Sequence, residues 1–214
     1  MITNERSGQY SVPARQRARF VREAADVRRQ ALIDATARCL AEKGVGGTSV
    51  RAICAYAGVS SGLLTHYFDG VDALILATYV DVGAKVSAAL DAAVAAAGDD
   101  PRDRLRACLQ ANFLAPVLDP DLLATWIAFW SLVKSDPKVG AIHADVYGGT
   151  RAQLESLLRA ASPGMTDDQA RIAAISLTAL VDGLWLELCL DRSAFSPEEA
   201  QAMVGNAVTL VLGR

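Results

Sequence analysis

Aromatic and acidic side chains at helical spacing are the residues in this 214-residue chain that best suit binding chemistry. Trp126 and Trp130 are four residues apart, with Phe129 beside them, so one broad helical face carries all three rings. Asp182 and Trp185 share a second apolar segment. Aromatic faces with a buried carboxylate suit a cation such as a quaternary ammonium, and the alternative is ordinary core aromatics beside a satisfied Asp182. The candidate ligand-binding residues are Phe113, Trp126, Phe129, Trp130, Tyr147, Asp182 and Trp185.

Patterns typical of catalysis or metal binding are lacking. The chain has two histidines, His66 and His143, and no Ser-His-Asp arrangement, phosphate-binding loop or C-x-x-C pair. The four cysteines are widely separated among apolar neighbours, which favours buried thiols over a disulfide framework or a zinc site. We therefore expect no enzyme activity, no cofactor and no metal ion.

Residues 48–68 have the pattern of two short helices joined by a tight turn. Thr48 is placed to cap a first helix, which Gly58 ends because glycine readily takes a positive φ. Ser60 caps a second helix over residues 61–67. Two short helices across a glycine-containing turn form a helix-turn-helix, whose second helix normally enters the DNA major groove. The apolar residues expected to hold this unit together are Ile53, Ala57, Val59, Leu64 and Phe68.

The chain is predicted to have three regions, namely residues 1–25, residues 26–70, which contain this unit, and residues 71–214. Residues 1–25 are predicted to be a flexible Arg-rich arm that contacts DNA phosphates or, alternatively, is only a solvated tail. Residues 26–70 form the helix-turn-helix head, in which a helix over 26–43 begins near Arg28, within reach of the DNA backbone. Residues 1–70 carry ten Lys and Arg against six Asp and Glu (+4), and residues 71–214 carry eleven against eighteen (−7). This asymmetry suits a nucleic-acid contact confined to one end.

Residues 71–214 are predicted to form a helical body that binds ligand and dimerises. Apolar periodicity indicates helices over 71–97, 102–114, 121–135, 139–160, 167–190 and 197–212, the first of which connects head to body. We find no alternating strand pattern, no signal peptide and no apolar run able to span a bilayer. The expected fold is all-α with about nine helices, and we expect a cytoplasmic protein without membrane contact.

The two C-terminal helices are the candidate dimer interface. The helix over 167–190 is apolar on nearly all sides, so it is buried by its own domain or by a partner chain. Two apolar helices supply what a symmetric four-helix interface needs, and a dimer matches palindromic half-sites. The alternative is simple intrachain core. The candidate interface residues are Leu177, Leu184, Leu188, Met203, Val204, Val208 and Val211.

The head resembles the TetR-type repressors over residues 28–68, through RRQALIDATARCLAEKG and TSVRAICAYAGVSSGLLTHYF. The body segments TWIAFWS at 125–131 and ALVDGLWLELCL at 179–190 resemble the BetI-type branch, the choline-responsive repressors of glycine-betaine synthesis genes. The resemblance implies a homodimeric repressor of palindromic operator DNA, released by a small-molecule effector of unknown identity. Ligand in the body would tilt the long helix after Val71 and change the spacing of the two recognition helices.

The resemblance also assigns DNA-contacting residues. Thr48 and Ser60 would present hydroxyl and backbone N–H groups to phosphates. Arg28 would reach the backbone, and the second helix would meet the groove through Ser61, Gly62, Leu63, Thr65, His66 and Tyr67. Because that helix has no Arg, Asn or Gln, readout by shape and by the arm is expected.

One position departs from the family pattern. The family usually carries a phosphate-contacting lysine where this chain has Val71, and the N-terminal arginines would have to compensate. This departure keeps open an alternative function, a ligand-binding or scaffold dimer that has lost specific DNA binding.

Overall fold

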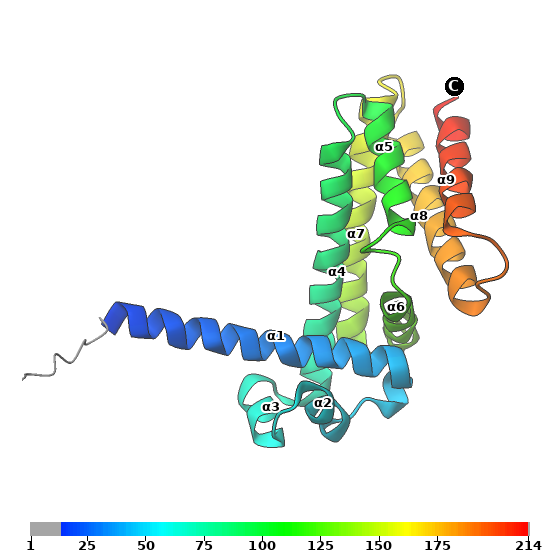
Figure 1. Cartoon of the computed structure of the whole chain (residues 1–214). Helices are drawn as coiled ribbons and strands as arrows, with labels where there is room; N and C mark the ends of the chain where they lie inside the picture. The colour runs from blue at the N-terminus through cyan, green and yellow to red at the C-terminus, as the bar shows by residue number, and fades with distance from the viewer. Residues whose placement is uncertain (1–13, 214) are drawn as a thin grey trace, which may run out of the picture.

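The computed structural model describes the backbone of residues 14–213 and the side chains from residue 25 onward. Every regular element in that range is helical, which confirms the all-α prediction. The head comprises α1 (Ala14–Gly47), α2 (Val50–Ala57) and α3 (Ser61–Tyr67). Figure 1 shows α1 lying across the foot of the body, with α2 and α3 beneath it. The body contains α4 (Gly70–Ala96), α5 (Pro101–Gln110), the 3-10 helix η1 (Ala111–Phe113), α6 (Pro120–Val133), α7 (Pro137–Ala161), α8 (Asp167–Leu190) and α9 (Pro197–Leu212).

The first helix begins at Ala14, whereas the sequence pattern placed its start at residue 26. Residues 14–25 read ARQRARFVREAA, and Ala, Arg, Gln and Glu are strong helix formers even without an apolar stripe. Helical propensity therefore extends α1 across the expected boundary between arm and head. The rest of the predicted arm, residues 1–13, lies outside the described residues.

The start of α2 corrects the predicted cap. Ser49, not Thr48, is the N-cap residue, and its hydroxyl oxygen accepts a hydrogen bond from the Ala52 N–H at 3.3 Å. The Thr48 hydroxyl instead donates to the Gly44 carbonyl at 2.8 Å, where α1 is kinked by a φ of 63°. Two adjacent hydroxyl residues both suited the cap, and the kink at Gly44 decides between them. The other predicted turn holds, with Gly58 at φ 65° and Ser60 capping α3.

Two hydrophobic cores meet on α4. The head core contains Leu32 of α1, Ile53 of α2 and Leu64 of α3, together with Leu74 of α4. One residue further along α4, Ile75 belongs to the body core. Helix α4 therefore contributes to both cores, as does α1, whose Leu40 belongs to the body core.

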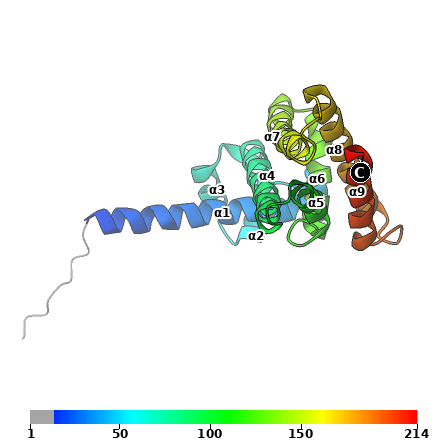
Figure 2. The ribbon, with the colours of Figure 1, turned by 90° about the horizontal axis from the view of Figure 1, so that it is seen from above.

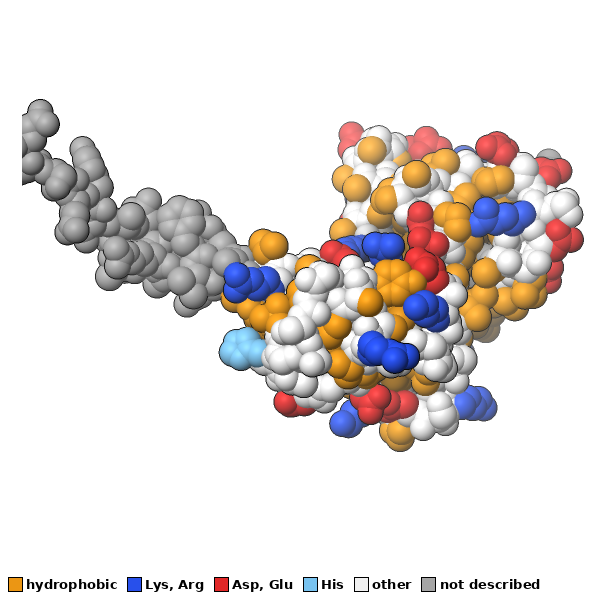
Figure 3. All heavy atoms as spheres, turned by 60° about the horizontal axis from the view of Figure 1, so that its bottom comes forward, with side chains coloured by type: hydrophobic (Ala, Val, Ile, Leu, Met, Phe, Trp, Pro, Cys, Tyr) orange, Lys and Arg blue, Asp and Glu red, His pale blue; other side chains and the backbone are white. Residues whose placement is uncertain are grey.

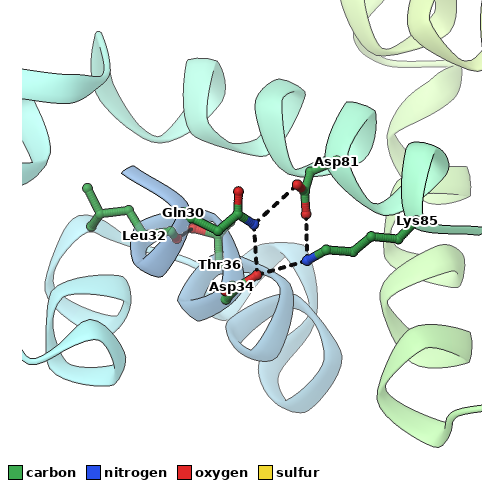
Figure 4. A network of polar contacts seen from close by, with 6 residues as sticks. All are labelled: Gln30, Leu32, Asp34, Thr36, Asp81 and Lys85. Carbon is green, nitrogen blue, oxygen red and sulfur yellow. Dashed lines mark hydrogen bonds and ion pairs between the residues drawn. The ribbon is translucent and has the colours of Figure 1, made fainter. Parts of the chain in front are cut away.

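A polar cluster also joins α1 to α4, and we call its four residues the α1–α4 clamp (Figure 4). The amide of Gln30 donates to Asp34 at 3.0 Å and to Asp81 at 3.1 Å. The Lys85 ammonium lies 3.0 Å from an Asp34 oxygen and 2.8 Å from an Asp81 oxygen. Burial lowers the pKa of Lys85, but the two carboxylates outweigh it and raise that pKa overall, so the lysine stays charged.

Helices α8 and α9 form the side of the body away from the free end of α1 (Figures 1 and 2). By length and composition alone, α4 and α8 could cross a membrane. The same composition is expected of the central helices of a bundle, and here each buries one side in the core.

Candidate DNA-binding surface and ligand cavity

The recognition helix α3 is held by one side and open on the other. Leu64 is fully buried and Phe68, its C-cap residue, is 7% exposed, with the Arg29 guanidinium 5.0 Å from the Phe68 ring centre. Residues three or four apart share a helix face, so these anchors leave the opposite face free. The exposed residues of this segment are Ser60, Ser61, Gly62, Thr65 and His66.

The structure brings most predicted DNA contacts together on this helix. Leu63 and Tyr67 are half-buried at its edges, and the Thr65 hydroxyl donates to the carbonyls of Ser61 at 3.3 Å or Gly62 at 3.2 Å. Arg28 is exposed but lies on α1, and Thr48 is half-buried before α2 with its hydroxyl already engaged. The α3 residues thus form one surface, and the other two positions belong to its surroundings.

Head cations that the sequence analysis did not single out pack on an aromatic ring. Arg38 and Lys43 place their charged groups 5.1 and 5.0 Å from the ring centre of Tyr56, whose hydroxyl donates to Glu42. Arg51 is exposed on α2. On the face of the head seen in Figure 3, the basic side chains of the described residues are scattered.

Val71, the position at which the family resemblance implied a lysine, has a structural role. Its side chain is half-buried and packs against both the head core and the body core. Apolar contact at the junction therefore replaces a charge at the start of α4.

A cavity of about 470 Å³ lies among α4, α5, α6, α7 and α8. Four of the seven predicted ligand residues line it, namely Trp126, Tyr147, Asp182 and Trp185. The other three, Phe113, Phe129 and Trp130, are not among the lining residues. Phe129 stacks on Tyr79 at 4.2 Å between ring centres, Phe113 is 1% exposed, and the indole N–H of Trp130 donates to the Tyr147 hydroxyl.

Tyr147 is the centre of the polar network in this wall. Its hydroxyl accepts hydrogen bonds from the indole N–H groups of Trp126 and Trp130, both at 3.1 Å. The same hydroxyl donates to Asp182 at 3.1 Å. The third indole N–H, on Trp185, donates to the Asn112 carbonyl at 2.9 Å. All three tryptophans thus use their polar edges within the protein, which leaves aromatic surface for a ligand.

Burial shapes the protonation of this wall. It raises the pKa of Asp182 to about 6, although the Tyr147 hydrogen bond and the charge of Arg151 pull it down. Burial and the nearby Asp182 raise the pKa of Tyr147, so its hydroxyl keeps its proton. Near neutral pH the cavity therefore contains a carboxylate in an aromatic, poorly hydrated setting.

The remaining lining residues were not predicted. They come mainly from α4 and α7, including Val80, Gly83, Leu90, Val146 and Leu154. A Cβ at residue 83 would lie 3.1 Å from a Val146 methyl, so glycine there permits the close approach of α4 to α7. The sequence carried no local signal for these residues, since they are ordinary helix residues that become lining only through packing.

The predicted dimer residues require a correction. Leu177, Leu184, Leu188, Val204 and Val208 are at most 8% exposed within one chain, and Val211 is half-buried. The five buried residues fill the body core rather than an outer surface; of the seven, Met203 alone is exposed. Five further apolar residues are exposed on the two helices besides Met203, namely Ile172, Ile175, Leu186, Leu190 and Leu210.

Comparison with known proteins identifies both parts of the chain. Residues 32–78 match the bacterial regulatory proteins of the TetR family, and residues 101–213 match the C-terminal domain of BetI-type transcriptional repressors. The HTH-type transcriptional regulator BetI of Burkholderia thailandensis is 35% identical over 187 residues, covering 87% of this chain and 94% of that protein.

Solved structures share the fold. A Pseudomonas aeruginosa PAO1 protein assigned as a transcriptional regulator is 42% identical, with a TM-score of 0.81 over 88% of this chain and 91% of the other. A Saccharomonospora viridis protein with the same assignment, in complex with choline, is 21% identical, with a TM-score of 0.71 over 83% of this chain and 93% of the other. The chain belongs to the TetR family of transcriptional repressors, in the group with a BetI-type C-terminal domain.

Proposed function

We propose that this repressor binds a palindromic operator as a homodimer in the cytoplasm and is released when a small organic cation occupies the cavity. The observation that carries the proposal is that α4 takes part in both sites. Leu74 belongs to the head core that positions α3, and Val80 begins the cavity wall less than two helical turns further on.

The free face of α3 supports insertion into the major groove. Its exposed side chains are small or planar, so the helix backbone can come close to the base edges. A Cβ at Gly62 would meet only the Ser60 hydroxyl oxygen, at 4.0 Å, so packing within the head does not demand a glycine there. A close approach of DNA to the helix backbone would explain the glycine at this position.

The cavity wall supports a cationic effector. An ionised Asp182 supplies charge, while Trp126, Tyr147 and Trp185 supply aromatic surface for cation–π attraction. A primary ammonium needs several acceptors, and one Asp182 oxygen is already shared with Tyr147. A quaternary ammonium needs none and fits better. The choline bound by the Saccharomonospora viridis protein supports the same class.

Release would follow from a population shift. A ligand that binds the body more tightly in one α4 orientation shifts the chain toward that orientation. Two recognition helices must be about one DNA turn, roughly 34 Å, apart to occupy successive half-sites. A tilt of α4 that alters this spacing weakens binding without touching α3 itself.

The outward apolar residues of α8 and α9 are the proposed dimer surface. Ile172, Ile175, Leu186 and Leu190 recur at helical spacing along one side of α8, and Met203 and Leu210 lie outward on α9. An apolar stripe on two neighbouring helices is what a self-complementary interface requires.

Operator binding with and without cations tests the proposal. Fluorescence anisotropy of labelled DNA from upstream of the gene is expected to report tight binding at physiological salt, weakened by choline. The uncharged isostere 3,3-dimethylbutan-1-ol serves as control, because it has the shape of choline without its charge. In the Asp182→Asn variant, DNA binding should persist and the choline effect should disappear. Absence of specific DNA binding at any site would contradict the repressor mechanism, and equal effects of choline and its isostere would contradict cation recognition.

A further inference from the structure

The cavity is longer than a small cation requires. Its lining extends from Val80 to Leu90 on α4 and from Ile142 to Leu154 on α7. At 1.5 Å of rise per residue these spans are about 15 and 18 Å. The two helices run in parallel, because Gly83 faces Val146 and the Gln153 amide donates to Asp91 at 2.6 Å. The pairs Val80 with Ile142 and Leu90 with Leu154 therefore mark opposite ends of the cavity.

The two ends differ in chemistry. Tyr147 and Asp182 lie toward the end near α6, together with the aromatic wall. Leu154 follows Tyr147 by about 10 Å along α7, and it marks an end lined by Leu90 and Cys108. The hydroxyls of Thr150 and Thr178, between these ends, already donate to carbonyls of their own helices at 3.2 and 2.8 Å. Apart from the exposed Ser87, the wall beyond the charged group is therefore apolar, and the hydroxyls of both threonines already have hydrogen-bond partners.

The volume of the cavity is larger than choline requires. A water molecule's share of liquid is about 30 Å³, so a cation of choline's size, with seven heavy atoms, displaces on the order of 200 Å³. The cavity measures about 470 Å³. Choline would leave more than half of it unfilled, next to apolar side chains that gain from burial.

We infer that the preferred effector is an amphiphilic cation, with a quaternary ammonium at Asp182 and an apolar chain running between α4 and α7 toward Leu90 and Leu154. This inference rests on the proposed cation site and adds the chemical class of the rest of the ligand. The head group alone would bind, and the chain would supply most of the affinity.

A series of n-alkyltrimethylammonium ions tests the inference on the full-length protein. The three tryptophans lie in or behind the cavity wall, so their intrinsic fluorescence reports binding without a label. Affinity is expected to rise about fourfold per methylene from methyl to hexyl, because each buried methylene contributes about 0.8 kcal/mol. The sodium alkanoates of equal chain length serve as controls and should not bind, since they carry the opposite charge.

Two variants test where the alkyl chain of the ligand lies. Ser87 lines the cavity and is exposed, whereas Ala88 is exposed and does not line it. Ser87→Trp should remove the gain with chain length while leaving tetramethylammonium binding within about twofold, and the matched Ala88→Trp should behave as the unmodified protein.

The outcomes separate the two levels of the proposal. If choline binds but hexyltrimethylammonium binds no tighter, or if Ser87→Trp weakens both equally, the inference fails and the cation site stands. If no member of the series binds while operator DNA still does, the cation site fails and the inference with it.

Discussion

The two proposed sites are built in opposite ways. The DNA-facing surface comes from eight neighbouring residues, 60–67, most of whose exposed groups are small. The cavity draws on five helices between residues 80 and 185, and its central hydroxyl, on Tyr147, joins residues up to 35 positions away.

The DNA-facing surface therefore depends mainly on how its helix is positioned, whereas the cavity depends mainly on the chemistry of its side chains. On α3 the groups proposed to contact DNA are small, so DNA binding depends on the core that holds the helix in position. In the body the buried carboxylate of Asp182 is the proposed cation partner, so ligand binding depends on its protonation and on its aromatic neighbours. Substitutions at the two sites should therefore impair binding in different ways.

The largest expected effect comes from the head core. Leu64 is fully buried, and Leu64→Ala should destabilise the head by about 2–5 kcal/mol and weaken operator binding more than a hundredfold. Circular dichroism melting and anisotropy measure the two quantities. Leu63→Ala is the matched control, because Leu63 is half-buried and faces the proposed groove. This substitution should weaken DNA binding while lowering the stability of the head by less than about 1 kcal/mol. Loss of cation binding in Leu64→Ala would contradict the separation of head and body.

The next effect is a pH dependence confined to the body. Because burial raises the pKa of Asp182 to about 6, cation affinity should fall about tenfold between pH 7 and pH 5 as the carboxylate takes up a proton. Tryptophan fluorescence titrations across this range measure it. In Asp182→Asn the profile should be flat, and a flat profile in the unmodified protein would show that this carboxylate does not pair with the ligand.

Folding stability should respond to the same group with the opposite sign. The folded-state pKa lies above the ordinary value of 3.8, so the folded chain binds more protons than the unfolded chain between about pH 4 and pH 6. Stability is then greatest below pH 4 as far as this group is concerned, and it falls as pH rises through 6, by at most about 3 kcal/mol. Asp182→Asn should lessen that decline in urea unfolding measured at several pH values.

A smaller effect is expected at the α1–α4 clamp. The side chains of Lys85 and Asp34 are 59% and 53% exposed, so their ion pair should contribute less than about 1 kcal/mol to stability. Lys85→Met should nonetheless lessen the factor by which a cation weakens operator binding, by about two- to fivefold, since it loosens α4 from α1. Arg106→Met is the control, because it removes a surface pair with Asp103 within α5. Equal coupling in both variants would exclude a role for the clamp.

The smallest effect concerns the missing family lysine. Val71→Lys should steepen the salt dependence of operator binding by about 0.9 in log–log slope, the value of one added phosphate contact. Val71→Ala gives the packing loss without the charge. An unchanged slope in Val71→Lys would place the start of α4 away from the DNA backbone.

Local patterns made most of the fold predictable. The Gly58-Val59-Ser60 turn, the Thr166 cap and the bounds of α8 and α9 all depend on residues within four positions of one another. The exceptions are informative. The cap at Ser49 depends on the kink at Gly44, and the start of α1 depends on helix propensity rather than on an apolar stripe.

The sites were less predictable than the helices. Trp126 and Trp130 share a helix face, yet only Trp126 lines the cavity, because the position of Tyr147 on another helix decides which ring faces inward. The same holds for α8, where the pattern indicated burial without telling that Leu184 faces the core and Leu186 the outside. Such choices depend on contacts between distant segments, which no local window contains.

The most direct test of coupling through α4 is reciprocal binding. Titrating a cation into free protein and into protein saturated with operator DNA gives two affinities, whose ratio must equal the factor by which the cation weakens DNA binding. We predict weaker cation binding to the DNA complex, by a factor of about 5 to 150. Equal cation affinities in the two states would show that the cavity and the recognition helix are not connected.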